Sequence, residues 1–360
     1  MANANLGNAR KAKNDEFYTQ FHDIEKEMNA YLEYNPEVFK DKTILLPCDD
    51  PEWSNFTRYF AQNFEKLQLK KLISTSYAPN SKPREITYQP TLFEIDSPEF
   101  DETKTISNGK IFTLSYDRTG DKNINVEDLE WEYLEGDGDF RSDEIKTLRD
   151  EADVIITNPP FSLFREFLAW IVEAKKRFVI IGNLNAITYK EVFPLVREDK
   201  MWLGVTRTGV GHMYFEVFDG APAKTGQISE NGRKMQTIGN SAWFTNLDHG
   251  RRHQPLPLMT EADNIKFSKH KQVRDVGYQK YDNYEAIEVP FTDAIPSDYV
   301  GAMGVPITFL GKYSPEQFEI VGLAAGNIRG LAGIPTTTGK DGPYINGKLK
   351  YGRILIRHRS

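Results

Sequence analysis

Residues 153–162, with the sequence Asp-Val-Ile-Ile-Thr-Asn-Pro-Pro-Phe-Ser, are the stretch from which the fold is predicted. The run from Val154 to Thr157 is short, apolar and β-branched, which predicts a buried strand. Two consecutive prolines must end that strand, because proline lacks a backbone N–H and restricts the residue before it. We therefore expect Asn158 and Phe161 at the carboxyl end of a strand, where open α/β sheets bind their ligands.

The residue types at this corner suit a planar base that carries an amino group. The Asn158 side-chain carbonyl and the Pro159 backbone carbonyl can accept hydrogen bonds from an exocyclic amine, and Phe161 offers a face for stacking. The tetrapeptide Asn158-Pro159-Pro160-Phe161 resembles the catalytic tetrapeptide of S-adenosylmethionine-dependent amino-methyltransferases, which act on adenine N6, cytosine N4 or a protein glutamine amide. A proline-stiffened turn without any chemistry would have the same local sequence.

Length and composition narrow the class of protein. The 360 residues are enough for two domains or one elaborated domain, and a hydrophobic share of 39% is enough for a core. We expect no membrane span, and the polar residues 1–14 are expected to form a flexible tail rather than a signal peptide. The single cysteine, Cys48, excludes an internal disulfide and fits the cytoplasm. No Cys/His spacing predicts a metal site.

The charge is divided unevenly along the chain. The net charge is −7, but residues 200–360 hold 20 Lys and Arg against 15 Asp and Glu, a balance of +5. The first 199 residues hold 25 basic and 37 acidic residues, a balance of −12. This pattern is expected for a domain that carries the cofactor and the chemistry, followed by a region that faces a polyanion. A chance distribution of surface charge is the alternative.

The first half of the chain reads as strands alternating with helices. Strands are predicted at Thr43–Pro47, Lys71–Ser76 and Phe178–Gly182, with an edge strand at Lys110–Tyr116. Helical stripes run over residues 24–32, 56–67 and 163–172. This alternation predicts a mainly parallel sheet, with residues 202–206, 213–218 and 241–245 as later strands that close it as an antiparallel hairpin. Residues 79–110 are expected to form an irregular insertion.

Two acidic turns are candidate cofactor contacts. Asp49, Asp50 and Pro51 follow the first strand, where carboxylates can meet a cationic amine or a ribose hydroxyl, although two N-cap aspartates would look alike. The turn Gly136–Phe140 can place Asp139 against an adenine amine with Phe140 beside the ring, although Gly-Asp pairs are also common surface turns. A ribose-binding acid is expected just after Ser76 and is missing there.

The region after Gly250 combines basic residues with aromatic ones. Arg251 and Arg252 lie in a turn-rich junction, and Lys269 and Lys271 lie among Phe267, Tyr278, Tyr281 and Tyr284. Such groups can hold phosphates and stack on bases, which makes the four basic residues candidates for DNA contacts. A solvated basic surface would have the same composition.

Four motifs together resemble the EcoRI-type adenine-specific DNA methyltransferase family, and the resemblance spans nearly the whole chain. They are Asp15-Glu16-Phe17-Tyr18-Thr19, Cys48-Asp49-Asp50-Pro51 with Ser54-Asn55-Phe56, Gly136–Phe140, and Thr157–Arg165; segments 304–310 and 316–322 are also similar. The resemblance implies a Rossmann-like α/β methyltransferase sheet in residues 15–250, followed by a target-recognition region in residues 251–360. Its motif order implies cofactor contacts at Phe17, Tyr18, Thr19, Asp49, Asp50, Pro51, Asp139 and Phe140, and a catalytic tetrapeptide at Asn158–Phe161.

The function that the resemblance implies is methyl transfer from S-adenosylmethionine to N6 of a flipped adenine in double-stranded DNA. We expect a cytoplasmic monomer without a membrane partner, accompanied in some systems by a separate restriction endonuclease. Methylation of an RNA base or a protein glutamine is the alternative within the same chemistry. From another class, Glu144-Ile145-Lys146 fits a Glu-x-Lys metal-nuclease pattern, which would make the chain a DNA-binding or nuclease subunit.

Overall fold

The computed structural model describes residues 18–48, 54–78, 97–206, 213–216, 227–230, 233–237, 240–326 and 330–359. The chain divides into two compact units. Unit 1 comprises Met1–Asn183 and Thr206–Leu247, and unit 2 comprises Leu184–Val205 and Asp248–Ser360. The sequence placed a single boundary after Gly250, so it did not foresee that residues 184–205 belong with the C-terminal part. In the described ranges, no helix has both the length and the apolar character needed to cross a membrane.

Unit 1 is built on a mixed sheet in which the strands run in the order β5-β4-β3-β2-β6-β7-β12. The four central strands are parallel: β3 (Lys71–Ser76), β2 (Thr43–Leu46), β6 (Val154–Thr157) and β7 (Arg177–Asn183). The flanking strands β4 (Lys110–Leu114), β5 (Glu130–Tyr133) and β12 (Ser241–Thr245) are antiparallel to their neighbours. The predicted α/β methyltransferase-like sheet is therefore confirmed, and β6 lies in its middle.

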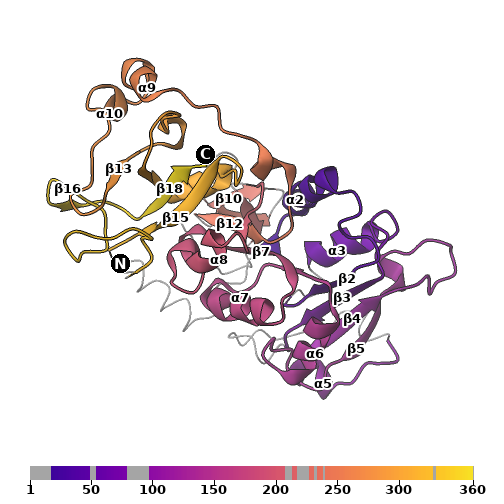
Figure 1. Cartoon of the computed structure of the whole chain (residues 1–360). Coiled ribbons are helices and arrows are strands. Elements are labelled where there is room, and N and C mark those ends of the chain that lie inside the picture. Colours follow the sequence, from indigo (N-terminus) through magenta and orange to yellow (C-terminus); the bar gives the residue numbers. More distant parts are fainter. Residues whose placement is uncertain are drawn as a thin grey trace. The chain divides into compact units, whose positions relative to one another are not determined.

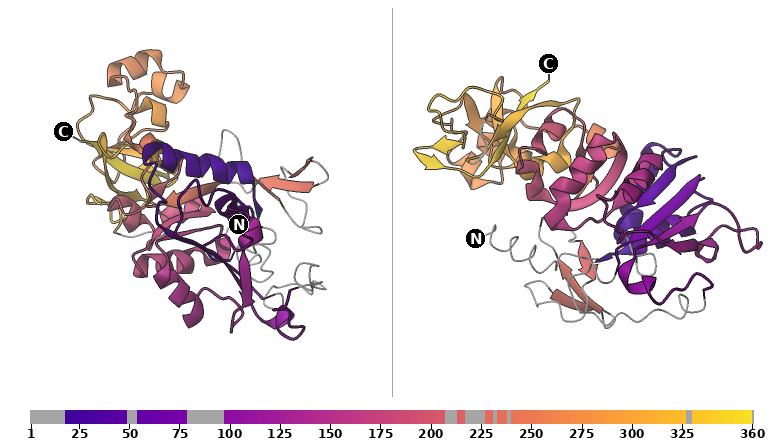
Figure 2. Two further views of the ribbon diagram at one scale, coloured as in Figure 1. Left: turned by 90° about the vertical axis from the view of Figure 1, so that its right-hand side faces the viewer. Right: turned by 90° about the horizontal axis from the view of Figure 1, so that it is seen from below.

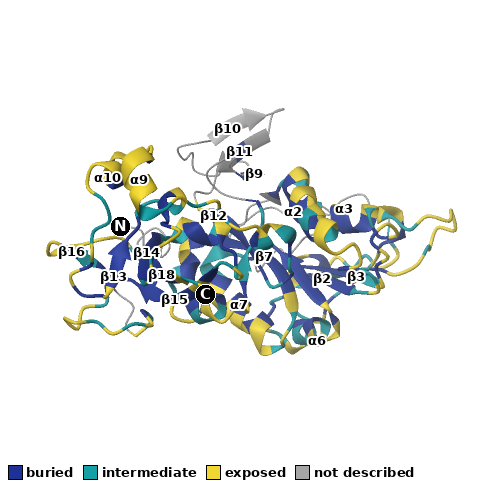
Figure 3. Cartoon of the chain, turned by 45° about the horizontal axis from the view of Figure 1, so that its top comes forward, coloured by how far each residue is buried: buried dark blue, intermediate teal, exposed yellow. Residues whose placement is uncertain are grey.

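Helices cover both faces of this sheet (Figure 1). Helices α2 (Phe21–Tyr34) and α3 (Asn55–Gln62) pack on the face that carries Ile44, Leu46, Val154 and Ile156. Helices α6 (Asp143–Glu151) and α7 (Phe164–Glu173) lie on the other face, which Figure 3 shows below the strands. Because residues of a strand alternate between faces and both faces are covered, β2 and β6 are buried along their whole length.

Two details of the predicted sheet and one of a predicted helix are wrong. Strand β4 is not at the edge, because β5 pairs with it on the outside. Strand β12 does close the parallel part against β7, but residues 214–216 do not form a hairpin with it. They form β9 (Tyr214–Glu216), which joins β1 (Tyr18–Thr19), β11 (Arg233–Thr237) and β10 (Gln227–Glu230) in a separate small sheet. Helix α3 also ends at Gln62 rather than continuing to Leu67. Short helices α5 (Lys104–Ser107) and η2 (Val126–Asp128) flank β4 and β5.

Unit 2 is organised around a second sheet of order β13-β14-β18-β15. Its strands are β13 (Ala286–Glu288), β14 (Ala302–Pro306), β18 (Arg353–His358) and β15 (Phe318–Ala324). The remaining elements are η4 (Leu184–Thr188), α8 (Phe193–Arg197), β8 (Trp202–Leu203), η5 (Gly250–His253), α9 (Glu261–Phe267), α10 (Lys271–Arg274), η6 (Thr292–Ala294), η7 (Ile307–Lys312), β16 (Tyr344–Ile345) and β17 (Lys348–Leu349). Within this unit, α9 and α10 lie side by side at the periphery (Figure 2).

A buried ion pair links two strands of the second sheet. Arg353 of β18 donates to both carboxylate oxygens of Glu288 on β13, and its Nη2 lies 2.6 Å from Glu288 Oε1. The Tyr281 hydroxyl donates to the same carboxylate. Glu288 and Arg353 meet across β14, which lies between their strands. Gly304 of β14 leaves room for Tyr281, because a Cβ there would lie 2.1 Å from the Tyr281 hydroxyl oxygen. The carboxylate is thus fully engaged in a poorly solvated place.

Candidate active site

The end of β6 is fixed by contacts to neighbouring elements. The Thr157 hydroxyl donates to the Pro47 carbonyl at 2.6 Å, which joins the carboxyl ends of β2 and β6. Pro160 precedes the short helix η3 (Phe161–Leu163), and α7 follows directly. A Cβ at Gly182 on β7 would lie 2.3 Å from the Phe164 ring, so glycine allows α7 to start close to the sheet. The four residues Asn158–Phe161 therefore form a rigid corner at the strand end.

Within this corner Pro159 is buried, whereas Asn158, Pro160 and Phe161 are half-buried. The Phe161 ring packs in part against the core that α2 and α3 share with the sheet. The expected position of Asn158 and Phe161 at the carboxyl end of a central parallel strand is thus what the structure has. Part of the Phe161 side chain packs against the core, and the side chain as a whole is half-buried.

The Asn158 amide is oriented by a residue far away in the sequence. Its Nδ2 donates to the Thr19 hydroxyl at 3.3 Å, and the Thr19 carbonyl accepts from Asn55 Nδ2 of α3 at 2.8 Å. Thr19 is 4% exposed, so this link is shielded from water. Because the nitrogen end of the Asn158 amide is directed to Thr19, its oxygen end is the one that can accept from an amine.

Replacing Thr19 by valine tests this orientation, since valine keeps the shape and removes the acceptor. We expect kcat to fall about tenfold, with little change in the KM for DNA. The reason is that the Asn158 amide loses a hydrogen bond of roughly 1–2 kcal/mol and with it its preferred orientation. Steady-state kinetics of the variant against wild type measure this. An unchanged kcat would show that Thr19 does not orient the amide.

The turn Gly136–Phe140 is attached to the end of β3. The Ala78 N–H donates to the Asp137 carbonyl at 2.8 Å. Gly138 has a φ of +83°, and a Cβ there would lie 2.3 Å from the Ser76 carbonyl oxygen, so only glycine fits this approach. The turn therefore presents Asp139 and the Phe140 N–H at the same edge of the sheet as Asn158.

The two residues that end this turn differ in how far they match the sequence prediction. The Asp139 carboxylate accepts from Arg141 at both oxygens, with Nε at 2.9 Å and Nη2 at 2.5 Å. The Phe140 ring was expected beside an adenine, but it is 1% exposed and packs edge-on against Phe167 and Trp170. That expectation is corrected: the α7 aromatics take the ring into the core, so Phe140 can offer a ligand only its backbone.

Tyr77 stands where the missing ribose-binding acid was expected, directly after β3. Its side chain is half-buried, and its backbone lies against the turn, because a Cβ on Gly138 would be 3.4 Å from the Tyr77 Cα. Burial, followed by the proximity of Cys48 and Asp139, raises the pKa of Tyr77 far above its ordinary value, so the phenol stays neutral. The hydrogen bond with Asp139 raises the pKa of Arg141, which keeps the guanidinium charged.

The edge of an adenine presents a donor amine beside an acceptor ring nitrogen. The Asp139 carboxylate is an acceptor and the adjacent Phe140 N–H is a donor, which are the two kinds of group that such an edge needs. Other predicted cofactor residues cannot be compared, because Phe17, Asp49, Asp50 and Pro51 lie outside the described residues, and Tyr18 is described only by its backbone in β1.

Comparison with known proteins decides the family. The model of a family described as adenine-specific methyltransferase EcoRI matches residues 5–359. The chain belongs to this family. It is 41% identical to the Type II methyltransferase M.EcoRI of Escherichia coli, over 98% of this chain and 96% of the relative. It is 32% identical to the Type II methyltransferase M.MpnI of Mycoplasma pneumoniae, over 98% of this chain and 97% of the relative. It is 33% identical to the Type II methyltransferase M.MgeORF184P of Mycoplasma genitalium, over 97% of this chain and 97% of the relative. No solved structure matches the chain significantly.

The chain is accordingly an adenine-specific DNA methyltransferase, as its four motifs led us to expect. Family and fold agree, because β6 delivers the tetrapeptide Asn158–Phe161 to the carboxyl edge of the sheet and β3 holds the adenine-compatible turn beside the same edge. The structure adds Asn55, Tyr77 and Arg141 to this site, and it adds a hydrogen bond between Thr19 and Asn158. The sequence had proposed a role for Thr19 but not for Asn55, Tyr77 or Arg141.

The structure around Glu144-Ile145-Lys146 does not support the alternative of a metal-dependent nuclease. Glu144 accepts from the backbone N–H groups of Glu135 and Gly136, and Lys146 pairs with Asp143. The Ile145 side chain between them is buried. Among the described residues no group of His, Cys, Asp and Glu side chains could hold a metal ion. The Glu-x-Lys triplet thus lies near the start of helix α6, where Glu144 binds the backbone of the preceding turn.

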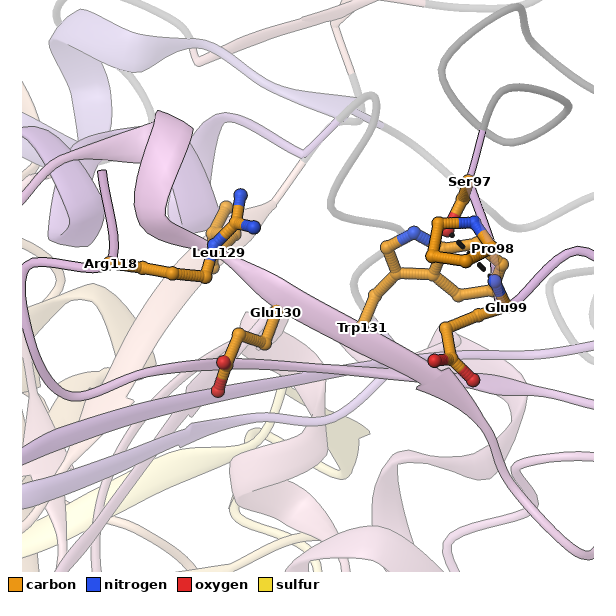
Figure 4. Close-up of a pocket in the computed structure, with 7 residues that line it drawn as sticks. All are labelled: Ser97, Pro98, Glu99, Arg118, Leu129, Glu130 and Trp131. Atoms are coloured by element: carbon orange, nitrogen blue, oxygen red, sulfur yellow. Dashed lines mark hydrogen bonds between the residues drawn. The ribbon is translucent and has the colours of Figure 1, made fainter.

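A pocket of about 450 Å³ lies at the opposite margin of the unit 1 sheet. It is lined by Ser97, Pro98, Glu99, Arg118, Leu129, Glu130 and Trp131 (Figure 4). Its main strand, β5, is separated from β6 by β4, β3 and β2. None of the candidate catalytic or cofactor residues lines it, so it is not the active site.

The four predicted DNA contacts in unit 2 have different environments. Lys271 is exposed at the start of α10, and Lys269 is exposed and pairs with Asp293 at 2.7 Å. Arg251 is exposed, and its guanidinium donates a hydrogen bond to the Val205 carbonyl. The prediction that Arg252 contacts DNA is wrong. Its side chain is 6% exposed, pairs with Asp199 and lies 3.7 Å above the Trp202 ring, so it holds unit 2 together and cannot reach a phosphate.

Next to Arg252, His253 is held between two carboxylates. Its Nε2 lies 2.9 Å from Asp248 and its Nδ1 lies 2.6 Å from Glu316. Burial alone would lower the pKa of His253, but the hydrogen bonds to Glu316 and Asp248 outweigh it and raise the pKa above 6.5. The protonated imidazole therefore stabilises the folded unit.

This gives a pH-dependent contribution to stability with a defined sign. It is present in full below the pKa of an unfolded histidine, about 6.5, and is lost as pH rises through the raised folded-state value. We expect His253→Gln to lower the unfolding midpoint more at about pH 6 than at about pH 8.5, as measured by thermal unfolding. The exposed His22→Gln is the control; a deficit for His253→Gln that does not change with pH would refute the assignment.

Proposed function

We propose that this methyltransferase transfers a methyl group from S-adenosylmethionine to N6 of an adenine that is rotated out of duplex DNA. The observation that carries the proposal is the rigid corner at the end of β6, where the Asn158 amide is oriented by Thr19 beside two prolines and Phe161. The chain belongs to an adenine-specific family, which supports adenine as the methylated base.

The corner residues act by position rather than by forming a covalent bond. The Asn158 carbonyl oxygen and the Pro159 carbonyl accept from the N6 amine, which keeps the nitrogen electron density directed at the methyl donor. S-adenosylmethionine supplies a methyl group on a positively charged sulfur. The N6–methyl bond forms as the sulfur–methyl bond breaks, and the amine then releases one proton to solvent. Cys48 has no role in this scheme.

Rotating the adenine out of the duplex costs on the order of a few kcal/mol. Stacking of the base on Phe161 is proposed to offset roughly 1–3 kcal/mol of this cost. The stack also fixes the plane of the base, so that its amine lies in line with the two carbonyl acceptors. Pro159 and Pro160 restrict the backbone that presents these acceptors, which lowers the entropy lost when the base binds.

We propose that the cofactor adenine is read by Asp139 and the Phe140 N–H, and that Phe17, Tyr18, Thr19, Asp49, Asp50 and Pro51 complete the cofactor site. The glycine at position 138 supports this, since the left-handed turn brings the reading groups against the end of β3. The aromatic side chain of Phe140 is left out of the proposal because it is buried.

DNA is proposed to be held by the basic C-terminal region, residues 251–360, with Arg251, Lys269 and Lys271 as phosphate contacts. Their exposure supports this role. In line with the Type II methyltransferases that the chain resembles, we propose a monomeric enzyme of a cytoplasmic restriction-modification system, with a cognate endonuclease that acts separately. The single cysteine, Cys48, fits that compartment.

The proposal is tested by methyl transfer from labelled S-adenosylmethionine to three substrates: duplex DNA, RNA of the same sequence, and a protein extract. We expect label in DNA alone, recovered as N6-methyladenine after digestion. Label in RNA or in a glutamine amide would favour the alternative substrates. Magnesium-dependent cleavage of DNA without methyl transfer would instead support the nuclease alternative.

A further inference from the structure

Strands β16 and β17 form a short hairpin that does not belong to the second sheet of unit 2. They pair antiparallel, with Ile345 opposite Lys348. The two residues between them, Asn346 and Gly347, have φ values of +51° and +72°. Positive φ at both positions is typical of the tight turn whose twist matches that of a hairpin. Within unit 2 the hairpin lies at the periphery (Figure 1).

The turn of this hairpin is held by a carboxylate from another part of the chain. Asp282 accepts from the Asn346 N–H at 3.1 Å with one oxygen and from the Gly347 N–H at 2.7 Å with the other. The Asp282 N–H donates to the Tyr344 carbonyl at 2.8 Å. One side chain therefore satisfies both amides of the turn, and the exposed tip keeps a fixed shape.

The base of the hairpin is held by the next residue, Asn283, which is 1% exposed. Its Nδ2 donates to the carbonyls of Lys340 and Gly342 at 2.7 and 2.8 Å, and its Oδ1 accepts from the Tyr344 N–H at 3.1 Å. Ile345 of β16 is buried in the core of unit 2. A segment that is ordered in this way loses little conformational entropy when a ligand binds to it.

The side chains of the second strand and of the residue after it are open to a ligand. Residues 348–351 are all exposed, and Tyr351 is 87% exposed. Lys348 and Lys350 alternate with Leu349, so their side chains leave the strand on one face, from Cα atoms about 6–7 Å apart. Residues 342–352 contain no Asp or Glu. Within the described ranges neither lysine forms an ion pair, so both charges are available.

We propose that the β16–β17 hairpin is a preorganised phosphate-binding element for duplex DNA, in which Lys348 and Lys350 contact neighbouring phosphates of one strand. The charge of the hairpin is complementary to DNA, and the separation of the two lysines is similar to that of successive phosphates. We take residues 251–360 as the part that holds DNA, so this role of the hairpin rests on the proposed function.

The double variant Lys348→Gln/Lys350→Gln tests the two contacts. We expect it to bind duplex DNA about tenfold more weakly at about 0.1 M salt, and the slope of log affinity against log salt to become smaller by about 1–2. Fluorescence anisotropy of a labelled duplex, with the full chain and S-adenosylhomocysteine, the non-reactive cofactor product, measures both. A duplex with the methylated sequence and one without it should lose the same factor, because phosphate contacts do not read bases.

The matched control is Lys66→Gln/Lys70→Gln, which removes the same charge. Both lysines are exposed and lie between α3 and β3, at the edge of the unit 1 sheet opposite to Asn158, so DNA affinity and salt slope should stay as in wild type. Wild-type DNA affinity of Lys348→Gln/Lys350→Gln would overturn the role of the hairpin. A loss confined to the duplex with the methylated sequence would overturn the assignment to phosphates.

Asp282→Ala separates the shape of the hairpin from its charge. Removing an acid near two lysines by itself strengthens DNA binding, whereas a turn that is no longer held weakens it. We expect DNA binding to be about threefold weaker in this variant, with S-adenosylhomocysteine affinity and unfolding midpoint as in wild type. Equal or tighter DNA binding would overturn the preorganisation of the hairpin by Asp282.

Lys269→Gln/Lys271→Gln distinguishes a failure of this inference from a failure of the proposed function. These lysines lie outside the hairpin, and their loss should also weaken DNA binding if the C-terminal region holds DNA. If this variant and Lys348→Gln/Lys350→Gln both bind like wild type, the role of residues 251–360 is wrong. If only Lys269→Gln/Lys271→Gln binds more weakly, the C-terminal region holds DNA and the hairpin does not take part.

Discussion

Asn158→Ala is expected to lower kcat for DNA methylation by about a hundredfold to a thousandfold, the usual effect of removing one preorganised hydrogen-bonding group from a transition state. The alanine lacks the carbonyl that accepts from the adenine amine, while the backbone corner set by Pro159 and Pro160 remains. Binding of S-adenosylhomocysteine should stay within about twofold of wild type, because Asn158 is proposed to contact the substrate base. Single-turnover methylation and calorimetry measure the two quantities.

Two further variants sharpen this result. Asn158→Asp keeps an acceptor oxygen but loses the donor to Thr19, so we expect activity between wild type and alanine. Asn35→Ala, at the exposed end of α2, is the control for a general effect of removing an asparagine. An Asn158→Ala enzyme that methylates DNA within a factor of about two of wild type would remove Asn158 from the mechanism.

Arg353→Met should produce the largest loss of stability, about 3–5 kcal/mol, because it leaves the Glu288 carboxylate in the unit 2 sheet without its cationic partner. The side chains of Arg353 and Glu288 are only 13% and 10% exposed, so water cannot replace the lost bonds. Chemical denaturation followed by fluorescence measures the loss. We expect DNA binding to fail first, while unit 1 still binds S-adenosylhomocysteine, if the proposed division of roles between the two units is right.

The matched control is Arg357→Met, on the same strand β18 but exposed, for which we expect a change below about 0.5 kcal/mol. The double variant Glu288→Leu/Arg353→Met removes both charges and should recover most of the stability. A double variant as unstable as the single one would show that packing, not the unpaired carboxylate, is responsible.

The features that depend on short stretches of the chain could be predicted from the sequence. A β-branched run that ends in Asn-Pro-Pro specifies a strand and its end within a few residues, which is why β6 and the position of Asn158 were correct. The parallel centre of the sheet was likewise accessible, because each strand carries its own apolar pattern and is followed by a helical one.

The parts that were missed depend on contacts between residues far apart in the chain. No local pattern indicates that Thr19 orients Asn158, or that Ala78 binds the backbone of Asp137. The basic character of Arg252 says nothing of Asp199 and Trp202, which bury it, and a Gly-Asp-Phe turn does not show toward which face its ring points. The return of residues 184–205 to unit 2 is similarly a property of the tertiary structure.

The most direct test of the central claim is to sequence the genome of a methylation-free host after expression of wild type and of Asn158→Ala. The wild-type enzyme is expected to place N6-methyladenine at every copy of one short recognition sequence, and the variant at only a small fraction of those copies. Complete methylation of the same sites by Asn158→Ala, or no N6-methyladenine with folded wild type, would contradict the assignment of Asn158.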